Sequence, residues 1–158
     1  LAEKGDAAGA RDEAGKIEAL EKTADWSTMD AFFIPARDVL RVAQNVVLAR
    51  AAQAKGDTTE AITYFQAAAG VQDSIPYMEP PYWYYSVRQS LGAVLLQAGR
   101  PKDAEAVYRE DLKRHAHSGW SLFGLAQSLR AQGATEAAAK AQREFEAMWA
   151  HADIKLSD

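Results

Sequence analysis

The chain contains no cysteine, so disulfide bonds and thiol chemistry are excluded. Proline is scarce, with five in 158 residues, and no run approaches the roughly 18 apolar residues that a membrane-spanning helix needs. No segment alternates between apolar and polar residues as a half-buried strand does. The net charge of −4 gives no general attraction to nucleic acid or anionic lipid. We therefore expect a soluble protein that binds neither nucleic acid nor membranes.

Alanine dominates what is present, together with leucine, glutamine, glutamate, arginine and lysine. These residues lose little conformational entropy in a helix. With 48% hydrophobic residues, a chain of 158 residues is long enough to bury one core. The composition therefore predicts a single all-α domain over 1–158.

Glycine recurs at the ends of predicted helices, at Gly56, Gly99 and Gly133. The last two are 34 residues apart. A leucine precedes each glycine by eight residues, at Leu48, Leu91 and Leu125, and an alanine follows each by five, at Ala61, Ala104 and Ala138. A period of 34 residues with such fixed offsets is typical of an array of helix-turn-helix units.

The middle unit shows the physical reason for this pattern. Gly99 can adopt the left-handed conformation that ends a helix, and Pro101 suits the first turn of the next one. Gly92 and Ala104 are small, which lets two antiparallel helices approach closely. Tyr108 is then predicted to fill the space between them.

These residues resemble the tetratricopeptide repeat, in which a Leu-Gly pair is followed by an alanine and, four residues later, by an aromatic residue. Leu91-Gly92, Leu95, Ala104 and Tyr108 fit the pattern, whereas Arg88 and Ala116 stand at its tryptophan and proline positions. The resemblance covers units at about 42–75, 85–118 and 119–152. It implies about seven helices, paired antiparallel and stacked as a right-handed superhelix, in one solenoid domain.

A partial repeat is predicted over 1–24, because Glu3 to Ala10 matches Ala54 to Ala61. The chain therefore resembles a fragment, the C-terminal part of a longer bacterial protein of this family. The compartment, cytoplasmic or periplasmic, is left open.

In the resembled family, the first helix of each pair lines a concave binding face. Carried over by position, the resemblance implies a binding stripe of Arg50, Gln89, Trp120, Phe123, Gln127 and Arg130. Arginine and glutamine suit the carbonyls and carboxylates of a peptide, and an exposed aromatic suits an apolar anchor. These side chains are expected to face away from the seams between helices, although Trp120 could instead pack against the preceding helix.

Two segments interrupt the array. Val71 to Tyr85 holds three prolines and a second set of candidate binding residues, Tyr77, Tyr82, Trp83 and Tyr84; it is either a recognition loop or a packed connection. In the segment from Thr23 to Val39, Pro35 could begin a helix, and Trp26, Phe32 and Phe33 are expected to pack onto neighbouring helices.

No arrangement of residues indicates an enzyme, a metal or a cofactor. His115 and His117 offer too few ligands for a structural zinc site. The carboxylates, Asp111 among them, are expected on solvated faces with basic neighbours three or four residues away. The serines lie in no nucleophile motif.

The sequence therefore favours a non-catalytic module that binds a protein or peptide segment on its concave face. The alternative is an accessory domain of a larger enzyme or small-molecule binder, with the chemistry upstream of this chain. A third interpretation is self-association through the surface of the truncated N-terminal repeat.

Overall fold

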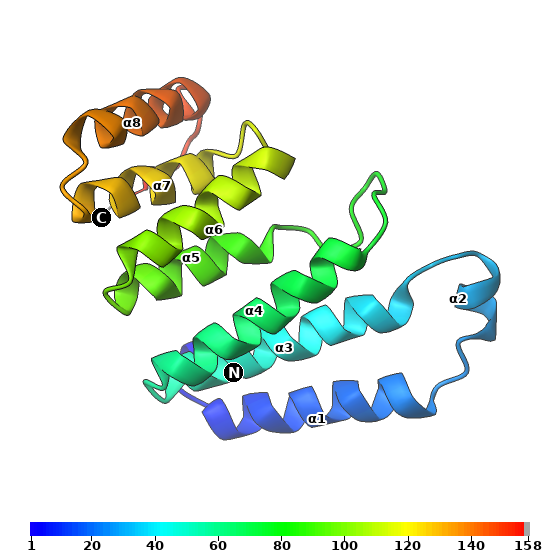
Figure 1. Ribbon diagram of the computed structural model, residues 1–158. Helices are drawn as coiled ribbons and strands as arrows, with labels where there is room; N and C mark the ends of the chain where they lie inside the picture. Colours follow the sequence, from blue (N-terminus) through cyan, green and yellow to red (C-terminus); the bar gives the residue numbers. More distant parts are fainter. Residues whose placement is uncertain (157–158) are drawn as a thin grey trace. The chain divides into compact units, whose positions relative to one another are not determined.

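The computed structural model describes residues 1–156, and all regular secondary structure in that range is helical. A short 3-10 helix, η1 (Ala2–Lys4), precedes the α-helices (Figure 1). These are α1 (Ala7–Thr23), α2 (Ser27–Ala31), α3 (Ala36–Ala54), α4 (Thr58–Ser74), α5 (Val87–Gln97), α6 (Pro101–Arg114), α7 (Gly119–Ala131) and α8 (Thr135–Trp149). The predicted all-α class is confirmed. The helix that the sequence did not predict is α2, which is five residues long.

The helices form two compact units, one from Leu1 to Val87 and one that begins at Arg88. In the first unit, α3 packs against both α1 and α4. In the second, α7 packs against both α6 and α8. Neighbours along the chain are thus neighbours in space within each unit, as in a helical repeat. The right-handed superhelix and the single solenoid domain stay predictions.

Each predicted glycine turn is confirmed. Gly5, Gly56, Gly99 and Gly133 have positive φ values between 68° and 81°. At Gly56, the glycine N–H donates to the Gln53 carbonyl (2.9 Å), and the next N–H donates to the Ala52 carbonyl (3.0 Å). The same pair of hydrogen bonds recurs at the other three glycines. These two bonds satisfy carbonyls that the end of a helix leaves unpaired, and the left-handed glycine makes them possible.

Tyr108 of α6 fixes the packing of the second unit. Its ring is 4% exposed and lies against two glycines on neighbouring helices. A Cβ atom would stand 2.4 Å from the ring at Gly92 of α5 and 2.1 Å from it at Gly124 of α7. Burial raises the pKa of Tyr108, and the nearby Asp111 charge adds to that rise, so the phenol stays neutral. The prediction that Tyr108 fills the space where α5 and α6 approach at Gly92 is confirmed, whereas its contact with Gly124 was not predicted.

The connection between α1 and α3 corrects a prediction. Pro35 stands directly before α3, close to its predicted place. Phe32 and Phe33, however, are 73% and 89% exposed, so the expectation that they pack onto neighbouring helices is wrong. The reason is local: α2 ends in a left-handed turn at Phe33, which leaves both rings outside the α1–α3 seam. Figure 1 shows α2 beyond the ends of these helices.

We predict that Gly92→Ala and Gly124→Ala each lower the free energy of unfolding by about 1–3 kcal/mol, because the added methyl overlaps the Tyr108 ring. The matched control is Gly70→Ala in α4, where an added Cβ meets no atom within 4 Å. That change should raise stability by about 0.4–1 kcal/mol. Urea unfolding followed by circular dichroism measures all three. Equal effects at the three positions would contradict the close contact of the Tyr108 ring with Gly92 and Gly124.

Candidate functional site

Two of the predicted binding residues, Trp120 and Phe123, join an aromatic cluster between α7 and α8. The Trp120 ring meets Trp149 edge-on at 5.3 Å, and Phe123 lies 5.2 Å from Phe145. Phe145 in turn stacks on Trp149 at 5.5 Å. We call these four residues the aromatic ladder. The expectation that Trp120 and Phe123 face away from helix seams is therefore wrong, because both rings contact α8, the helix that follows.

The ladder is only partly buried. Phe145 is 7% exposed, whereas Trp120 is 48% exposed. Aromatic pairs at such distances gain roughly 0.5–1.5 kcal/mol beyond their area burial. Trp120 thus contacts Trp149 while about half of its surface stays exposed to solvent.

The start of α7 explains how the ladder is held. Ser118 caps the helix, since its side chain accepts a hydrogen bond from the Ser121 N–H (3.3 Å). Gly119 follows, and a Cβ there would stand 2.4 Å from the Trp149 ring. The Trp149 indole N–H donates to the Ile154 carbonyl (2.8 Å). Gly119 therefore lets the Trp149 ring lie against the backbone of α7, and Trp120, the next residue in the sequence, lies beside that ring.

The polar half of the stripe continues along α7. Arg130 donates to the Gln142 side chain of α8 at 3.4 Å, and Gln127 is half-buried. Trp120, Phe123, Gln127 and Arg130 succeed one another at intervals of three or four residues, so they share one face of the helix. The structure thus brings these four predicted residues together within one unit.

Gln89 leads to a buried polar cluster that the sequence analysis did not predict. Its amide donates to the Ser118 hydroxyl (3.2 Å), which donates to Ser121 (3.2 Å). The Ser121 hydroxyl donates to Asp111, and His115 Nδ1 lies 3.0 Å from the other Asp111 oxygen. Asp111 is fully buried, so its expected place on a solvated face is wrong. A buried carboxylate needs such donors, because burial removes its hydrogen bonds to water and only protein donors can replace them.

Arg50, the predicted binding residue of the first unit, is already engaged within that unit. Its guanidinium lies over the Phe65 ring, 5.3 Å from the centroid, and donates to the Gln53 side chain (3.1 Å). A cation held over an aromatic ring is partly pre-oriented. Arg50 is exposed in spite of these contacts, so it stays a candidate.

The alternative site, between α4 and α5, divides into exposed and half-buried rings. Tyr77 and Tyr84 are 86% and 81% exposed, whereas Tyr82 and Trp83 are half-buried. Trp83 lies 5.4 Å from Tyr84. The segment therefore combines both readings of the sequence, a packed connection and an exposed aromatic surface.

Gln72 of α4 anchors the end of this loop. Its side chain donates to the Tyr85 carbonyl (2.8 Å) and accepts from the Val87 N–H (2.9 Å).

Neither a metal site nor a membrane span is found in the part of the chain that is described. No group of three or more histidine, aspartate or glutamate side chains in residues 1–156 could hold a metal ion. None of the helices in that range is long and apolar enough to cross a membrane. No family model, curated protein or solved structure matches the chain.

We predict that Ser121→Ala lowers the free energy of unfolding by about 1–3 kcal/mol, because it removes a buried donor from Asp111. His115→Ala should cost less, since the histidine side chain is 53% exposed and water can replace it. Thermal and urea unfolding compare the two variants. A larger loss at His115 than at Ser121 would show that the imidazole, not the hydroxyl, stabilises the carboxylate.

Proposed function

We propose that the chain is a non-catalytic protein-interaction module of the tetratricopeptide type, which binds an extended peptide segment along α7. The observation that carries this proposal is Trp120. It is half-exposed, yet its ring is held in place by Trp149. An aromatic side chain that is already ordered loses little entropy on binding, so it makes an effective anchor.

The residues beside Trp120 suit a peptide. From Trp120 to Arg130 the stripe runs ten residues along the helix, which is roughly 15 Å. That length matches about four or five residues of extended chain. Arg130 can bond a carboxylate at one end, while Trp120 contacts an apolar side chain at the other. We therefore propose a ligand with a bulky apolar residue and an acidic group about four residues away.

The geometry of the buried polar cluster gives no support to catalysis. In a serine nucleophile, the hydroxyl donates to an imidazole base that a carboxylate orients. Here the Ser121 hydroxyl donates to Asp111 instead, and Ser121 is fully buried. The cluster is therefore assigned to stability. The recurrence of the same turn hydrogen bonds 34 residues apart, at Gly99 and Gly133, supports the family resemblance.

Peptides selected from a random displayed library against the wild-type chain test this proposal. We predict that Trp120→Ala weakens the selected peptides by about thirtyfold, equivalent to about 2 kcal/mol, with Arg130→Ala acting mainly on acidic peptides. Calorimetric titration measures the affinities, and circular dichroism checks that the variants stay folded.

The matched control is Tyr84→Ala, since Tyr84 is an exposed aromatic residue in the alternative loop. Affinities that fall with Tyr84→Ala and not with Trp120→Ala would move the site to that loop. If no peptide is enriched over a blank support, the proposed function is wrong.

A further inference from the structure

The turn after α2 repeats the geometry of the glycine turns with a different residue. The Phe33 N–H donates to the Asp30 carbonyl (3.1 Å), and the Ile34 N–H donates to the Met29 carbonyl (2.9 Å). This is the same pair of bonds that closes the turns at Gly5, Gly56, Gly99 and Gly133. Phe33 accordingly has a φ of 55°, and it is the one described residue other than glycine with a positive φ.

A phenylalanine is an unfavourable choice at this position. The left-handed conformation costs a residue with a Cβ atom about 1–2 kcal/mol, which glycine avoids. Packing within the unit does not offset this strain energy, because Phe33 is 89% exposed and Phe32 beside it is 73% exposed. Backbone strain that no contact within the protein offsets suggests that Phe33 interacts with another molecule. We call Phe32 and Phe33 the tip.

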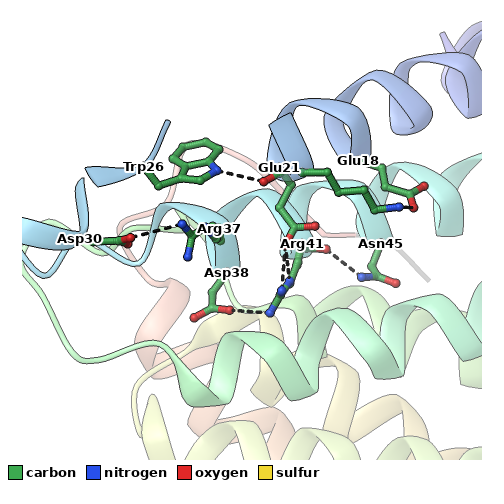
Figure 2. Close-up of polar contacts among 9 residues, drawn as sticks. Glu18, Glu21, Trp26, Asp30, Arg37, Asp38, Arg41 and Asn45 are labelled. Atoms are coloured by element: carbon green, nitrogen blue, oxygen red, sulfur yellow. Dashed lines mark hydrogen bonds and ion pairs between the residues drawn. The ribbon is translucent and has the colours of Figure 1, made fainter. Parts of the chain in front are cut away.

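Ion pairs fix the segment that carries the tip (Figure 2). Arg37 at the start of α3 pairs with Asp30 of α2 at 3.2 Å. Arg41 pairs with Glu21 of α1 at 2.8 Å, and the Trp26 indole N–H donates to the Glu21 carbonyl (2.9 Å). The segment that carries the tip is therefore connected to α1 through Trp26 and to α3 through Asp30, while the two rings themselves stay exposed.

The surroundings of the tip carry a small net negative charge, although four of the five carboxylates there pair with basic side chains. The ends of α1 and α3, together with the connection between them, carry more carboxylates than basic groups. The carboxylates are Glu18, Glu21, Asp25, Asp30 and Asp38, and the basic residues are Lys22, Arg37 and Arg41. An apolar tip with a net negative border fits a hollow with a positive border, and it is repelled by an anionic membrane.

The second unit contains a hollow of that kind. It lies where the α5–α6 turn meets the end of α7, has a volume of about 410 Å³ and is open to solvent. Its lining residues are Gly99, Arg100, Pro101, Lys102, Ala131 and Gln132. An enclosed cavity of about 150 Å³ accepts benzene, so the volume of this open hollow leaves room for a phenyl ring. Arg100 pairs with Asp103 at 2.7 Å, whereas Lys102 makes no ion pair within residues 1–156.

We propose that the tip of one copy of this chain docks in the Gly99–Gln132 hollow of a second copy. The two phenyl rings are removed from water, and the net negative charge around the tip faces Lys102, since Arg100 is already paired with Asp103. Because the tip and the hollow are different surfaces, the contact is head-to-tail and extends from copy to copy. This interaction uses none of the residues of the peptide stripe on α7, although the hollow begins at Ala131, directly after Arg130.

Sedimentation velocity over about 10 μM to 1 mM protein tests the proposal, since so small a contact is weak. Wild type should grow in mean mass with concentration, and added salt should weaken the association. Phe32→Ser with Phe33→Gly should stay monomeric. Phe33→Gly should also raise the melting temperature by roughly 1–4 °C, because it relieves the turn. Loss of association with a raised melting point excludes unfolding as its cause.

A mixing experiment identifies the opposing surface. Lys102→Glu with Ala131→Gln alters the hollow at two exposed positions, and this variant should also be monomeric. Mixed in equal amounts, the tip variant and the hollow variant should form a one-to-one complex and no larger species, because one tip and one hollow remain intact. Lys140→Glu, an exposed charge reversal on α8, is the control and should associate like wild type.

Three results would overturn the proposal. The first is a wild type that stays monomeric over the whole concentration range. The second is association that survives the tip variant. The third is two monomeric variants that fail to combine when mixed. Flotation of a monomeric wild type with phosphatidylcholine vesicles, lost in the tip variant, would assign the tip to a lipid surface instead.

Discussion

The left-handed turn at the end of a helix is the constraint on which the rest of this structure depends. At Gly56, Gly99 and Gly133 it reverses the chain within two residues and fixes where the next helix starts. Helix starts in turn fix the register between neighbours, so Tyr108 arrives opposite Gly92 and Gly124. A shift of one residue would turn that ring by about 100° around the helix axis, away from both glycines.

Helix ends were predictable because glycine at a helix end has a local cause, which the sequence displays at a fixed period. Burial of a charged residue has a less visible cause. Asp111 follows Ala104 and Tyr108 by seven and three residues, so it shares their buried face. That spacing indicates that Asp111 is buried, but the charged residues around it in the sequence made an exposed position look equally reasonable. Its partner Ser121 comes from another helix, and no local pattern states such a pairing.

The candidate site shows the same division. Register along one helix places Trp120, Phe123, Gln127 and Arg130 on one face of α7. What each side chain touches depends on α8, and the sequence alone did not assign Phe145 and Trp149 to that contact. Gly119 carried an unused signal: a glycine in the first turn of a helix marks a place where something approaches the backbone closely.

The distribution of aromatic residues connects the fold to its proposed interactions. The core is built largely from alanine and leucine, and Phe65, Tyr108 and Phe145 are its buried rings. Phe32, Phe33, Tyr77 and Tyr84 are mostly exposed, and Trp120 is half-exposed. Helices lined with alanine approach closely and leave little room for rings between them. Rings outside such a core contribute little to folding, which is why the proposed interactions are built on them.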